Sequence, residues 1–152
     1  MTKHRSKADK IGDCFIAFKC IKEGRPVKRD GAKDGSVPTH PVVPVPDLPE
    51  TDVKAACLKW LKHRGVFCDG HDCGSGNFGF GYATYGIKNS GDVHGILKYQ
   101  NGKHFELELK KGTGGRQSKG QQKRMRDVRA NNGYYFIVHG IPELEHYMGG
   151  LL

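Results

Sequence analysis

The sequence predicts an α/β fold with a mixed central sheet, and three stretches of the chain carry this prediction. Residues 91–109 contain two alternating runs that meet at Asn101-Gly102, a strong signal for a β-hairpin. A helical pattern opens after Ser118, and the run at 134–138 is aromatic and β-branched, as in a buried strand. A strand–helix–strand path calls for a right-handed crossover, so the sheet is expected to be parallel or mixed.

The clearest helix is predicted for residues 50–64, ahead of the hairpin. Its apolar positions recur with helical spacing on one face: Val53, Ala56, Cys57, Trp60 and Leu61. Pro49 and acidic residues suit the start of a helix, whereas basic residues and then Gly65 suit its end. A strand is expected to begin at residues 66–68, and a last helix at Ile141, with Pro142 near its first turn.

The first third of the chain predicts a separate region. Residues 1–10 are basic and polar, either a frayed end or a phosphate-contacting arm. Residues 11–22 fit a helix or a short strand equally well, and both stay open. Residues 23–49 combine turn residues with a proline-rich stretch and predict an extended linker. We therefore expect an N-terminal extension at 1–47 and one folded domain at 48–152.

Composition narrows the class of partner. The 152-residue chain is long enough for one domain around one core, and its formal net charge of +9 favours nucleic acid as a partner. No apolar run suits a membrane span, and the basic N-terminus lacks the apolar segment of a secretory signal. Five cysteines form no small disulfide framework, so we expect a reducing, cytoplasmic setting.

The second run of the hairpin predicts a charged site. Strand side chains alternate, so one face carries Phe105, Leu107 and Leu109, and the other Glu106, Glu108 and Lys110. Asp92 enters at the head of the partner strand, and His94 is expected at the rim of the same face. Two carboxylates on neighbouring strands can hold a hard cation, and a lysine beside it can have a lowered pKa and orient or deprotonate water. An isolated Glu-x-Lys would be an ordinary solvated face, but Asp92, the hairpin and the following helix favour a site.

The helix after the hairpin predicts a nucleic-acid surface. Ser118 and Gln121 form a capping box, and Gln121 also faces the sheet by its spacing. The preceding stretch at 111–117 is expected to be a flexible basic turn. Basic side chains of this turn and helix are expected to follow a phosphate backbone, which sets affinity without reading sequence: Lys111, Arg116, Lys119, Lys123 and Arg124.

A glycine-rich stretch at residues 69–91 holds a second possible site. Cys68, His71 and Cys73 are soft-ligand types in close order, but a zinc site usually needs a fourth ligand. An irregular loop is the better prediction. Its aromatic residues either cap the core or stack on exposed bases: Phe78, Phe80, Tyr82 and Tyr85.

Several of these residues occur in an order that resembles the PD-(D/E)xK nuclease superfamily. Within it, the chain is similar to the VRR-NUC branch of phage and repair nucleases. The matching positions are Glu50 on a helix, Asp92 after Gly91, Glu108 and Lys110 as E-x-K, and Gln121 downstream. The resemblance covers roughly residues 48–150, and the departure is Gly91, where the superfamily often has proline.

The resemblance implies a restriction-endonuclease-like core of helix–three strands–helix–strand–helix, and the activity of a metal-dependent DNA endonuclease. Asp92 and Glu108 would hold Mg²⁺ or Mn²⁺, together with the Leu109 carbonyl. Glu50 would bind a second metal or an ordered metal-bound water; a first-turn acid interacting with the helix dipole is its structural alternative.

In the same pattern, Lys110 would orient the attacking water and Gln121 would support Lys110 or the water, giving a 5′-phosphate product. Small VRR-NUC proteins resemble Holliday-junction resolvases and often pair, which implies branched or duplex DNA, a homodimer and, for a phage protein, the host cytoplasm. Two alternatives stay open: a nicking, fork-specific or restriction-like nuclease, and a non-catalytic nucleic-acid binder with zinc at Cys68, His71 and Cys73.

Overall fold

The computed structural model describes residues 7–24, 34–77, 79 and 81–152, and the chain divides into two compact units. The first, Met1–Ala32, contains α1 (Lys7–Lys22), so residues 11–22 form a helix rather than a strand. The second, Lys33–Leu152, carries the other described helices and strands. No helix within the described residues has the length and apolar character needed to cross a membrane.

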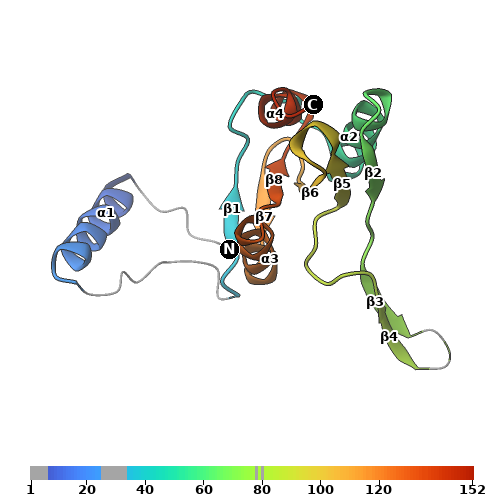
Figure 1. The fold of residues 1–152 in the computed structure, drawn as a ribbon. Helices are drawn as coiled ribbons and strands as arrows, with labels where there is room; N and C mark the ends of the chain where they lie inside the picture. Colours follow the sequence, from blue (N-terminus) through green and yellow to red (C-terminus); the bar gives the residue numbers. More distant parts are fainter. Residues whose placement is uncertain (1–6, 25–33, 78, 80) are drawn as a thin grey trace. The chain divides into compact units, whose positions relative to one another are not determined.

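A four-stranded mixed sheet lies at the centre of the second unit (Figure 1). Its spatial order is β2 (Phe67–Gly70), β5 (Val93–Leu97), β6 (Lys103–Leu109) and β8 (Tyr134–Val138). β5 is antiparallel to β2 and β6, whereas β8 is parallel to β6 and follows it through α3 (Lys119–Ala130). The predicted α/β class and mixed sheet are therefore confirmed.

The apolar core lies between the sheet and two helices, α2 (Glu50–His63) and α4 (Ile141–Met148). The stripe predicted on α2 supplies Val53, Cys57 and Leu61, all fully buried, and α4 adds Leu144 and Met148. The α2 prediction is confirmed to within one residue of its end. α3 contributes little to this core and carries polar side chains toward β6, so the two faces of β6 have different chemistry.

The predicted hairpin of β5 and β6 is confirmed. Its connection passes through the short 3-10 helix η1 (Lys98–Gln100) before Asn101 and Gly102, whose φ values are 57° and 71°. Asparagine and glycine tolerate this left-handed region better than other residues, which explains why this pair sits at the turn.

The expected glycine-rich loop is instead a second hairpin, formed by β3 (Gly74–Asn77) and β4 (Tyr82–Tyr85). It extends from the end of β2 beyond the sheet (Figure 1). Tyr82 and Tyr85 are 75% and 54% exposed, so they do not cap the core. Phe78 and Phe80, grouped with them above, lie outside the described residues.

The linker expected at residues 23–49 is also partly wrong, because β1 (Val37–Thr39) pairs antiparallel with β7 (Gly115–Gln117). The Gly115 N–H donates to Thr39 Oγ1 at 3.1 Å, and this hydroxyl also contacts Nε2 of the buried His139 at 3.1 Å. Residues 37–47 thus pack with the second unit, which begins at Lys33 rather than at residue 48. The same pairing makes part of the expected flexible turn at 111–117 a strand.

Candidate active site

Strand β6 and the residue that follows it, Lys110, carry charged side chains into the protein interior. Glu106, Glu108 and Lys110 are 0%, 2% and 8% exposed. The residues between them, Leu107 and Leu109, are fully buried in the apolar core. Because buried charges need partners, this arrangement differs from the ordinary solvated face that a Glu-x-Lys triplet usually marks.

Glu108 is held by donors from three elements. Lys110 Nζ donates to Glu108 Oε1 at 2.5 Å, and Gln121 Nε2 on α3 donates to the same oxygen at 2.6 Å. The Tyr135 hydroxyl on β8 donates to Oε2 at 3.1 Å. The orientation of this carboxylate therefore depends on the docking of α3 and the pairing of β8.

Gln121 completes the predicted capping box and faces the sheet, as its spacing predicted, whereas its support of Lys110 or the water stays a prediction. Its Oε1 accepts from the Ser118 N–H at 2.8 Å and its backbone N–H donates to Ser118 Oγ at 3.1 Å, which completes the capping box. The amide nitrogen at the other end of the side chain reaches Glu108. The start of α3 and the position of Glu108 are thus fixed by one residue.

The electrostatics of the pair favour a charged lysine. Burial raises the pKa of Glu108 to about 7, with Lys110 opposing this change and Asp92 adding to it. Desolvation acts to lower the pKa of Lys110, but the carboxylate of Glu108 and then the charges of Glu50 and Asp92 outweigh it, so the net pKa is raised. In this arrangement Lys110 is therefore a hydrogen-bond donor rather than a base, and the lowered pKa expected for a lysine beside a bound metal stays a prediction.

Asp92 directly precedes β5 and lies across from Glu108, since the next pair in the register is Val93 with Leu107. Its Oδ2 accepts from the Leu109 N–H at 2.7 Å. The backbone at residue 91 comes so close to β6 that only glycine fits, because a Cβ there would lie 2.7 Å from the Leu107 carbonyl oxygen.

Glu106 is the partner of Arg124 on α3. Arg124 Nε donates to both carboxylate oxygens, at 3.0 and 3.2 Å, and its NH2 group also reaches Oε1. The Gly91 N–H donates to Oε2 at 3.0 Å. Burial alone would raise the pKa of Glu106, but hydrogen bonds from Arg124, Gly91 and His104 lower it to about 2.

The predicted metal ligands converge only in part. Asp92 and Glu108 face each other across β5 and β6, whereas Glu50 is exposed at the first residue of α2 and reaches the pair through its charge on Lys110. The three carboxylates do not form a set with all ligand atoms within 4.8 Å. Their chemistry still suits a hard cation, because it would relieve the repulsion between Asp92 and Glu108.

Among the described residues, the one set of three possible ligands within 4.8 Å of one another is His94, His104 and Glu106. His94 Nε2 contacts the Gly91 carbonyl at 3.1 Å, and His104 Nε2 contacts Glu106 Oε1 at 3.1 Å. Arg124 already neutralises Glu106 through both oxygens. The guanidinium therefore competes with a cation for this carboxylate, although the three side chains lie close enough together to hold a metal ion.

The ligand atoms of Cys68, His71 and Cys73, which the sequence suggested as a zinc site, do not all lie within 4.8 Å of one another either. Cys68 is 5% exposed and belongs to the apolar core. Nε2 of His71 accepts from the Ile87 N–H at 2.9 Å, and its ring stacks on that of His94 with centroids 4.7 Å apart. Cys73 is exposed.

The five basic residues predicted to bind DNA have different surroundings. Lys111 and Lys119 are exposed, and Lys123 forms an exposed ion pair with Asp127 at 2.7 Å. Arg116 donates to the hydroxyl and carbonyl oxygens of Ser36, both at 2.7 Å. The guanidinium of Arg124 is bound to Glu106, and its phosphate contact stays a prediction.

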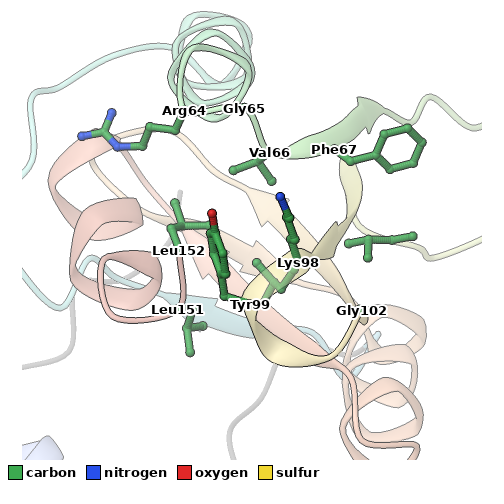
Figure 2. A pocket seen from close by; sticks show the side chains of 11 residues that line it. Arg64, Gly65, Val66, Phe67, Lys98, Tyr99, Gly102, Leu151 and Leu152 are labelled. Atoms are coloured by element: carbon green, nitrogen blue, oxygen red, sulfur yellow. The ribbon is translucent and has the colours of Figure 1, made fainter.

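A hollow of about 820 Å³ lies at the other end of the strands, where β5 passes into η1 (Figure 2). Apolar and aromatic side chains line it, among them Val66, Phe67 and Tyr99, together with Arg64 and Lys98. No Asp, Glu, His or Cys lines it. The hollow is therefore separate from the candidate site and offers no side chains of the metal-binding type.

Two members of the candidate site were not identified as such from the sequence. Tyr135 belongs to an aromatic strand that reads as core, and its bond to Glu108 depends on the pairing of β6 with β8. Glu106 reads as one more charge on a strand face. The signal that could have identified it is the spacing of Gln121 and Arg124, one helical turn apart, which matches Glu108 and Glu106 on β6.

Comparison of the chain with family models, curated proteins and solved structures found no match. The interpretation of the site therefore depends on its own geometry.

Proposed function

We propose that the chain is a metal-dependent endonuclease that hydrolyses DNA phosphodiester bonds, with a restriction-endonuclease-like core of the PD-(D/E)xK type. The observation that carries the proposal is the buried Glu108–Lys110 pair, 2.5 Å apart, with Asp92 opposite it and fixed on the Leu109 N–H. The element order α2, β2, β5, β6, α3, β8, α4 is consistent with such a core once β3, β4 and β7 are treated as additions.

Asp92 and Glu108 would hold Mg²⁺ or Mn²⁺, with the Leu109 carbonyl as a further ligand, and Glu50 would bind a second metal or an ordered metal-bound water. The repulsion that Asp92 exerts on Glu108 supports this choice, because a bound cation stabilises both carboxylates in their charged forms. When bound, the ion polarises the phosphodiester and lowers the pKa of water.

The side chains of the protein have separate roles in the proposed reaction. The ammonium of Lys110 orients the attacking water and stabilises negative charge that develops on the phosphoryl oxygens. Gln121 on α3 donates to one carboxylate oxygen of Glu108, and Tyr135 on β8 donates to the other. This preorganisation reduces the rearrangement that the site needs during the reaction.

The substrate is proposed to be branched or duplex DNA, with a homodimer as the active form. The net charge of +9 and the exposed Lys111, Lys119 and Lys123 support a phosphate-binding surface beside the site. Cleavage of four-way junctions, flaps and plain duplex would separate a junction resolvase from a nicking or restriction-like enzyme.

A nuclease assay with Mg²⁺ or Mn²⁺ tests the proposal. The native chain is expected to cut DNA only when the metal is present, and Lys110→Ala and Asp92→Ala are expected to lose cutting while they retain the fold and DNA binding. Circular dichroism and thermal unfolding check the fold of each variant. Metal-independent cutting, or full activity in both variants, would refute the assignment.

The same basic charge also supports a non-catalytic nucleic-acid binder as a second function. In that case the protein binds DNA without metal-dependent cutting. With a zinc site at Cys68, His71 and Cys73, which lie apart in the structure, the purified protein would also contain stoichiometric zinc.

A further inference from the structure

The Glu106–Arg124 ion pair lies next to the proposed metal ligands without being one of them. Glu106 is completely buried, and both its oxygens accept from Arg124. The Arg124 side chain is 31% exposed, against 71% for the neighbouring Lys123 on the same helix. Removing Arg124 would leave the buried charge of Glu106 without its guanidinium, so breaking the pair is costly.

We propose that Glu106 and Arg124 are positioning residues that hold Asp92 in place for the hydrolysis, an inference that rests on the proposed function. Glu106 Oε2 accepts from the N–H of Gly91, the residue directly before Asp92, at 3.0 Å. Asp92 in turn accepts from the Leu109 N–H at 2.7 Å. The Gly91-Asp92 turn is thus bonded to β6 at two points, and Glu106 provides one of them.

Helix α3 links this turn to Glu108. Gln121 and Arg124 are three residues apart and lie on one face of the helix, where they bind Glu108 and Glu106, two residues apart on one face of β6. The position of α3 therefore determines where both proposed metal ligands lie, Glu108 directly and Asp92 through Glu106 and Gly91. A displacement of Arg124 would release Glu106 and, through Gly91, Asp92.

The same residues could serve a different purpose, in which Arg124 binds a DNA phosphate and Glu106 only neutralises it in the free protein. The two explanations predict opposite effects of Glu106→Gln. An amide has one acceptor oxygen, so it cannot serve both Arg124 and the Gly91 N–H as the two carboxylate oxygens do. If Arg124 holds the Gly91-Asp92 turn in place through Glu106, the variant loses turnover. If Arg124 binds a phosphate, the freed guanidinium tightens DNA binding.

Steady-state cleavage at saturating Mn²⁺ distinguishes these outcomes. For Glu106→Gln we expect kcat to fall about a hundredfold with an unchanged KM for DNA, as for a misplaced catalytic group. Arg124→Lys keeps the charge but loses the paired hydrogen bonds, and we expect a smaller fall in kcat. Asp127→Asn breaks the exposed ion pair with Lys123 on the same helix and is the matched control, with unchanged kcat. A lower KM with native kcat in Glu106→Gln would overturn the proposal.

Amide hydrogen exchange provides a measurement that does not depend on cleavage. In folded Glu106→Gln, exchange at the Gly91 and Leu109 amides is expected to accelerate at least about tenfold, the effect of losing one hydrogen bond. Asp127→Asn should retain native exchange at both amides. If the native chain does not cut DNA, the proposed function fails, and the exchange rates still decide whether the pair holds the turn. Native exchange in Glu106→Gln would overturn the positioning role.

Discussion

Replacing Glu108 with glutamine should remove a pH dependence from the stability of the protein. The pKa of this carboxyl rises from 4.5 to about 7 on folding because of burial. Below about pH 4.5 the side chain is protonated in both states and does not affect the free energy of unfolding. Between these two values the unfolded chain releases the proton while the folded protein keeps it, so stability falls as the pH rises, and above about pH 7 the fall is complete.

At about 1.4 kcal/mol for each pH unit, this difference in pKa amounts to about 3 kcal/mol. Glutamine has the shape of the protonated acid and does not ionise, so this position adds no pH dependence to the stability of the variant. Glu108→Gln should therefore gain about 2.5 kcal/mol relative to the native chain between pH 5 and pH 8.

Urea unfolding at pH 5 and pH 8, in buffer with a chelator, measures this difference. Added Mg²⁺ should reduce the loss of stability that the native protein shows at pH 8, because a cation that binds only the folded state stabilises that state. Parallel stability curves for the two proteins from pH 5 to pH 8 would refute the reasoning, since Glu108 would then ionise as an exposed carboxyl does.

Three further predictions concern the surroundings of the site. Gly91→Ala should lower stability by about 1–3 kcal/mol in thermal unfolding and reduce cleavage, because its Cβ would press on the Leu107 carbonyl; native stability would contradict the close approach. Thr39→Val should destabilise by about 1–3 kcal/mol in denaturant titrations, because it leaves polar partners of the hydroxyl unsatisfied, including buried His139. A chain beginning at residue 48 should be less stable than one beginning at residue 33, since it lacks β1, and equal midpoints would restore the sequence-based boundary.

The elements with strong periodicity could be predicted from the sequence. The apolar stripe of α2, the alternation along β6 and the Ser118–Gln121 capping box each depend on residues close together in the chain. The position of Asp92 opposite Glu108 could also be predicted, because a hairpin fixes which residues of its two strands lie opposite each other.

The elements that were missed lack such local signals. β3 contains glycine at alternate positions and β1 contains Pro38, and both residue types are depleted in strands. The pairing of Arg124 with Glu106 spans eighteen residues and arises only when α3 packs on β6. For Lys110, a nearby cation would lower the pKa, whereas the buried ion pair with Glu108 raises it.

The alternation of β6 has one more consequence for how this protein can fail. A slip of one residue in the pairing of β5 and β6 would turn Glu106, Glu108 and Lys110 toward α2 and α4, and expose three large apolar side chains to α3. Such a misfolded sheet would therefore lose the apolar core and the Glu108–Lys110 pair in the same event.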